Sequence, residues 1–117
     1  MGKVAIICNG SENSNIYPTF IMASSAAALG DEVVIFFTPG GVPALKPGYL
    51  EELTAKGMPS MKELLEGIKS LGGRLVLCEL ALEAKDVTPE DLRDDLEISG
   101  ATSFMADIRD ANVTFSF

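Results

Sequence analysis

The sequence predicts a three-layer α/β/α domain in which helices cover both faces of a parallel five-stranded sheet. Strand-like and helix-like segments alternate along the chain, which is the order that produces parallel strands. The strand-like segments are continuous apolar runs, as expected for strands buried on both faces. The chain has 117 residues, enough for one hydrophobic core, so we expect a single domain over residues 1–117.

Short apolar and β-branched runs mark the expected strands, each closed by residues that favour turns. The five expected strands are Lys3–Cys8, Glu32–Phe37, Arg74–Cys78, Leu96–Ser99 and 112–117.

Helices are expected between these runs, with Asn13, Ser14 and Asn15 offering caps for the first. Ser60 and Glu63 have the spacing of a capping box at the start of a second. The expected helices cover residues 16–29, 61–71, 79–85 and 101–110, with a helical turn at 42–45 and no assignment for 49–57.

The charge balance argues against two classes of partner. The net charge is −8, and such a surface repels nucleic-acid phosphates and anionic lipid heads. No apolar run is long enough to span a bilayer, and no targeting segment is visible. We therefore expect a cytoplasmic protein that binds neither nucleic acid nor membrane.

The absence of histidine restricts the available chemistry. Triads that use histidine and histidine-ligated metal sites are excluded. Two thiols, Cys8 and Cys78, are too few for a structural zinc site. Thiol chemistry itself needs no metal and no organic cofactor, so none is expected.

Both cysteines stand where an expected strand ends, which is where parallel α/β sheets gather their functional groups. A helix start after Cys78 would favour its thiolate, whereas Glu79 and Glu83 would disfavour it. Cys78 is therefore either a reactive thiol or a small buried hydrophobe, and for Cys8 packing is the favoured interpretation. Other residues at these strand ends are candidates for pocket walls: Asn9, Thr38, Gly41, Ser99 and Thr102.

Three stretches in order resemble the DsrE/DsrF-like family of small sulfur-handling proteins. They are GDEVVIFFTPGGVPALK, GMPSMKELLEGIKSLGGRLVLCELALEAKDVTPEDL and ISGATSFMADIRDANVTFSF, and together they cover most of the chain. The resemblance implies a five-stranded parallel α/β/α domain that assembles into trimers or hexamers. It also implies that the cysteine ending the third strand, Cys78, accepts sulfane sulfur as a persulfide from a donor protein and passes it to an acceptor.

Two other functions remain open. The chain could be a non-catalytic oligomeric module in which Cys78 only packs. It could also be a small nucleotide- or flavin-binding protein, although the loop at 9–15 contains Glu12 and lacks threonine, and no phosphate-binding glycine motif is present.

Two narrower hypotheses concern neighbouring segments. If the first and third strands are adjacent, Cys8 could serve Cys78 as an auxiliary thiol within disulfide range. The segment 47–59, with Tyr49 and Met58, could form a lid or a docking surface for a partner.

Overall fold

The computed structural model describes residues 2–117 and contains one sheet of five parallel strands. Its order is β4-β3-β2-β1-β5. The strands are β1 (Lys3–Cys8), β2 (Glu32–Phe37), β3 (Arg74–Cys78), β4 (Leu96–Ser99) and β5 (Val113–Ser116). The expected fold class and all five strands are confirmed.

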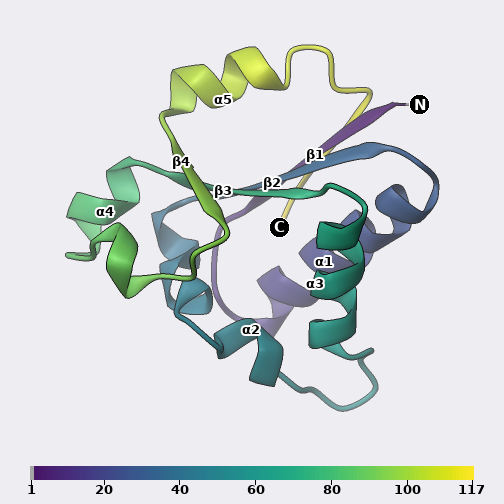
Figure 1. Ribbon diagram of the computed structural model, residues 1–117, viewed down its shortest axis with the longest axis horizontal. Helices are drawn as coiled ribbons and strands as arrows, with labels where there is room; N and C mark the ends of the chain where they lie inside the picture. The colour runs from purple at the N-terminus through teal and green to yellow at the C-terminus, as the bar shows by residue number, and fades with distance from the viewer. Residues whose placement is uncertain (1) are drawn as a thin grey trace.

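One face of the sheet carries most of the helical mass (Figure 1). In that view α5 lies alone above the sheet, while α1, α2 and α3 lie below it. The α-helices are α1 (Asn13–Ala28), α2 (Tyr49–Glu52), α3 (Met61–Ser70), α4 (Leu80–Ala84) and α5 (Ala101–Asp107). Two short 3-10 helices, η1 (Pro39–Leu45) and η2 (Pro89–Asp91), complete the element order.

The main core lies between the sheet and α1 and α3. Alternate strand residues such as Ile6, Ile35 and Leu77 are fully buried against these helices. Helix α3 begins as expected, because the Ser60 hydroxyl accepts a hydrogen bond from the Glu63 backbone N–H at 3.3 Å.

The start of α1 differs from the expectation. The helix begins at Asn13, and Glu12 occupies the capping position with Asn15 as its capping-box partner. The three polar residues 13–15 therefore form the first turn instead of preceding it, since Glu12 provides the cap. Gly30, which follows the helix, has a φ of 89°, in the left-handed region that ends helices.

A smaller core lies on the opposite face, under α5. Its buried members are Ala5, Val34, Phe36, Val76, Cys78 and Phe104. The phenyl rings of Phe104 and Phe36 stack with centroids 4.1 Å apart.

The connection from β4 to β5 runs from one edge of the sheet to the other, because these two strands are the outermost pair. Helix α5 lies on this connection and so crosses the three central strands (Figure 1). Among residues 2–117, no helix is long and apolar enough to cross a membrane.

Candidate functional site

Cys78 is the last residue of β3 and lies at the carboxyl edge of the sheet. It pairs in register with Ser99, the last residue of β4. The backbone N–H of Glu79 donates to the Ser99 carbonyl oxygen at 3.0 Å, which fixes the chain directly after the thiol. The register of β3 and β4 therefore places Cys78 and Ser99 side by side, where the two strands end together.

The Cys78 side chain faces α5 and is 6% exposed. Phe36 and Phe104 belong to the same small cluster, so the thiol lies in an apolar environment under the helix. Cys78 therefore lies at the expected edge of the sheet, and its side chain is almost fully covered.

Ion pairs hold α5 to the sheet near the carboxyl end of the helix. Asp107 accepts a hydrogen bond from the Arg74 guanidinium at 2.7 Å, and the Lys3 ammonium lies 3.6 Å from the same carboxylate. Arg74 also binds Glu97 through two hydrogen bonds of 2.8 Å, which lower the pKa of the Glu97 carboxyl. The amino end of α5, next to Ser99, has no side-chain cap. The ion pairs of α5 therefore lie at its carboxyl end, away from Cys78.

Glu79 places a carboxylate beside the amino end of α5. A Cβ added at Gly100 would lie 2.9 Å from the Glu79 Oε1 atom, so the glycine leaves room for this side chain. A negative charge at this end of a helix is favourable because the helix dipole is positive there.

Cys8 lies on the other face of the sheet and is fully buried. The Cys8 Sγ atom lies 3.4 Å from the Gly10 carbonyl oxygen and 3.8 Å from that of Asn15, and its single S–H can donate to either. Burial raises the pKa of the Cys8 thiol above its ordinary value. These contacts describe a packed thiol that ionises poorly near neutral pH.

The hypothesis that Cys8 and Cys78 exchange directly as strand neighbours is wrong. Strand β2 lies between β1 and β3, so the backbones at the two cysteines are about 10 Å apart, two strand spacings. In addition, the two side chains belong to cores on opposite faces of the sheet. A disulfide between them would require rearrangement of the sheet.

The expected pocket residues fall into two groups. Ser99 lies next to Cys78 at the end of β4, and the exposed Thr102 lies in α5, the helix that covers Cys78. Thr38 follows β2, the neighbour of β3, one residue beyond the register pair Phe37–Leu77, whereas Asn9 follows β1 and Gly41 lies in η1. That all five line one pocket stays a prediction.

The residues after β1 and β2 have structural roles. Asn9 donates from its side chain to the Ser116 hydroxyl at 3.1 Å, and the Thr38 N–H donates to the Cys8 carbonyl oxygen at 3.2 Å. A Cβ at Gly40 would collide with the backbone carbonyl oxygen of Asn9, and one at Gly41 would lie 3.1 Å from the Phe37 ring. Gly40 and Gly41 therefore let η1 pass closely over the end of β1.

Sequence reasoning missed a cavity on the opposite side of the fold, between α1 and residues 55–58. Tyr17 lines it, and the Tyr17 hydroxyl is buried without a hydrogen-bond partner among the described residues. The signal in the sequence was a tyrosine beside Pro18 near the start of the helix. No group of three or more metal-ligating side chains occurs within residues 2–117.

A parallel sheet with helices on both faces and a cysteine at its carboxyl edge defines a class of small α/β proteins. The chain belongs to the DsrE/DsrF-like family, whose model matches residues 2–117. This confirms the family resemblance found in the sequence.

Individual relatives agree with this assignment. The chain is 28% identical to the sulfur carrier protein DsrE2 of Allochromatium vinosum, over 87% of this chain and 89% of that protein. It is 23% identical to the uncharacterised protein YrkE of Bacillus subtilis, over 95% of this chain and 94% of YrkE. The crystal structure of the ychN protein of E. coli has the same fold, with a TM-score of 0.76, 16% identity and full coverage of both chains.

Proposed function

We propose that this protein is a sulfur carrier that holds sulfane sulfur as a persulfide on Cys78. Membership of the DsrE/DsrF-like family and similarity to a protein named as a sulfur carrier support a role in sulfur relay. The observation that carries the choice of residue is the contrast between the thiols: Cys78 lies at the carboxyl edge under one short helix, whereas Cys8 is fully buried and its pKa is raised.

The proposed transfer needs only thiol chemistry. The Cys78 thiolate attacks the outer sulfur of a donor persulfide, the donor's S–S bond breaks, and the donor leaves as a thiolate. An acceptor thiolate then attacks the outer sulfur on Cys78, and Cys78 returns to the thiolate. Neither step causes net oxidation, so the cycle requires no metal and no organic cofactor.

The cover over Cys78 has a function in this proposal. A persulfide is reactive toward small thiols and oxidants, and an apolar cover of Phe36 and Phe104 keeps them away between transfers. Because the amino end of α5 has no side-chain cap, it is the end that would lift to admit a donor.

Intact-mass spectrometry after incubation with a persulfide donor tests the proposal. We expect the wild-type protein and Cys8→Ala to gain the mass of one sulfur atom, and Cys78→Ala to gain none. Dithiothreitol should remove the added mass. A wild-type protein that gains no sulfur, or a Cys78→Ala variant that gains it equally, would contradict the proposal.

A second candidate is a non-catalytic oligomeric module, and the low exposure of Cys78 favours it. Three elements around Cys78 each carry an exposed apolar side chain: Leu80 on α4, Ile98 on β4 and Met105 on α5 are 67%, 38% and 60% exposed. In this alternative they bury one another in a homo-oligomer such as a trimer or hexamer, and Cys78 is a packed thiol. The mass experiment separates the two, since a packed thiol gains no sulfur in the folded protein.

A further inference from the structure

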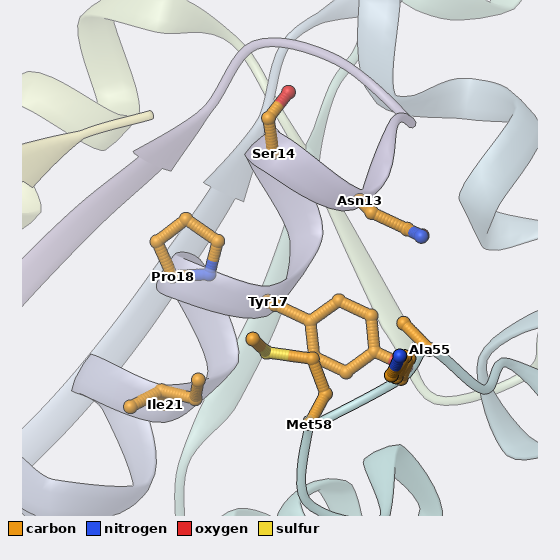
Figure 2. Close-up of a pocket in the computed structure, with 8 residues that line it drawn as sticks. Asn13, Ser14, Tyr17, Pro18, Ile21, Ala55 and Met58 are labelled. Carbon is orange, nitrogen blue, oxygen red and sulfur yellow. The ribbon is translucent and has the colours of Figure 1, made fainter.

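The largest cavity described lies far from Cys78, between the first turns of α1 and the segment 55–58. It has a volume of about 410 Å³, within the range of pockets that bind small molecules. Tyr17, Pro18 and Ile21 of α1 form one wall, and Ala55 and Met58 form the other (Figure 2).

The Tyr17 hydroxyl is the unusual polar group of this cavity. Tyr17 is 3% exposed, and its hydroxyl has no hydrogen-bond partner among the described residues. In Figure 2 the ring extends from α1 across the cavity toward Ala55. A buried hydroxyl without a partner is unfavourable, so a group that accepted its hydrogen bond would be held favourably.

The polar groups around the cavity include several hydrogen-bond donors. Lys56 is exposed at its rim, and no ion pair involves its ammonium among the described residues. Asn13 contributes a side-chain amide, and it is the first residue of a 16-residue helix, whose positive end lies there. Glu12 precedes it, but Glu12 forms the capping box with Asn15 and does not line the cavity. A cation, a positive helix end and a free hydroxyl together favour an anionic acceptor.

We propose that this cavity binds a small apolar carboxylate. The hydrocarbon part of the ligand lies against the Tyr17 ring, Ile21 and Met58, and the carboxylate pairs with the Lys56 ammonium and accepts from the Tyr17 hydroxyl. Residues 55–58 belong to no helix or strand, so this turn can shift to open the hydroxyl to the ligand. The site is independent of the sulfur-carrier proposal, since it shares no residue with the surroundings of Cys78.

Titration with octanoate, followed by isothermal calorimetry and by amide NMR shifts, tests this proposal. 1-Octanol is the matched neutral probe, because it has the same chain and no charge. We expect saturable octanoate binding, weaker octanol binding, and shifts concentrated in residues 13–21 and 55–58.

Two variants separate the contributions of charge and hydroxyl. Lys56→Gln should weaken octanoate binding about tenfold and leave octanol unchanged, whereas Lys62→Gln, on an exposed position of α3, should change neither. Tyr17→Phe should weaken octanoate binding about threefold to tenfold, while the ligand-free protein keeps or raises its Tm because an unpaired buried hydroxyl is removed. Weaker octanoate binding together with an unchanged or higher Tm would show that Tyr17→Phe removes a contact to the ligand without damaging the fold.

Several outcomes would overturn the proposal: no saturable binding of octanoate at millimolar concentration, equal binding of octanoate and octanol, or no effect of Lys56→Gln. Shifts centred on the exposed apolar residues Leu80, Ile98 and Met105 would also overturn it, because they would show nonspecific adsorption.

Discussion

The two faces of the sheet differ in what covers them, and each face holds one cysteine. Below the sheet, α1 and α3 bury a large core that includes Cys8. Above it, the seven residues of α5 cover a small cluster that includes Cys78. Both thiols end a strand and both are buried. A large core under two helices surrounds Cys8, whereas a small cluster under one short helix surrounds Cys78. The exposed fractions of the two cysteines therefore differ little. The free energy of the opening that exposes each thiol is the more useful distinction.

Native-state labelling should show the largest difference between the faces. Cys8 becomes accessible only when the main core opens, whereas Cys78 needs a local displacement of α5, so we expect Cys78 to react at least about a hundredfold faster with a maleimide. The rates are measured by intact mass on Cys8→Ala and Cys78→Ala, each of which keeps one thiol. Similar rates for the two thiols would refute the proposed difference between the faces.

Replacing one buried phenylalanine on each face with alanine compares how much the two cores contribute to the free energy of unfolding. Phe20 is fully buried in the main core, and Phe20→Ala should lower the free energy of unfolding by about 3–5 kcal/mol. Phe104→Ala should cost less, because its surroundings are smaller and closer to solvent. Urea denaturation measures both.

Phe104→Ala should also change the labelling rates of the two thiols differently. Phe104→Ala should speed the labelling of Cys78 and leave that of Cys8 near its wild-type rate, with Phe104→Leu as the milder control. If Phe104→Ala destabilised the protein as much as Phe20→Ala and accelerated both thiols equally, α5 would be part of one cooperative core.

The smallest expected effect concerns the ion pair between Arg74 of β3 and Glu97 of β4. Hydrogen bonds from Arg74 lower the pKa of Glu97 below its ordinary 4.5. This interaction therefore contributes stability above about pH 4.5, and the contribution is lost as the pH falls through the lowered pKa in the folded protein.

Arg74→Gln should lose this contribution at neutral pH and show a shallower decline in stability below pH 4.5. Because the Glu97 side chain is 49% exposed and water screens the pair, we expect no more than about 1 kcal/mol. Thermal unfolding from pH 7 to pH 3 measures the effect, with Lys62→Gln as the control. Parallel curves for wild type and Arg74→Gln would show that the Arg74–Glu97 ion pair does not contribute to stability.

The strands could be predicted from the sequence because each is a short apolar run with its own turn residues. The bounds of β3 and the position of Cys78 at its end follow from the run Leu75–Leu77 and from the glycines before it. The start of α1 was predicted three residues late, since several polar residues in succession could each provide the cap.

The arrangement around the thiol could not be predicted in the same way. Strand order depends on packing between distant segments, so nothing in the apolar runs showed that β2 separates Cys8 from Cys78. The cover over Cys78 depends on Phe104 stacking on Phe36, a contact across 68 positions of the chain that no local pattern reveals. Likewise, the Tyr17 cavity forms between α1 and the segment 47–59, which the sequence marked only as a possible lid or docking surface.

The path of the chain through β4, α5 and β5 has a consequence for biosynthesis. Residues 96–116 supply both outer strands, so a nascent chain has neither edge partner until these residues leave the ribosome. Until then β1 and β3 present unpaired backbone groups and can associate with other chains. Translation of about the last fifth of the sequence therefore closes both sides of the sheet and, with α5, covers the thiol on which the proposed function depends.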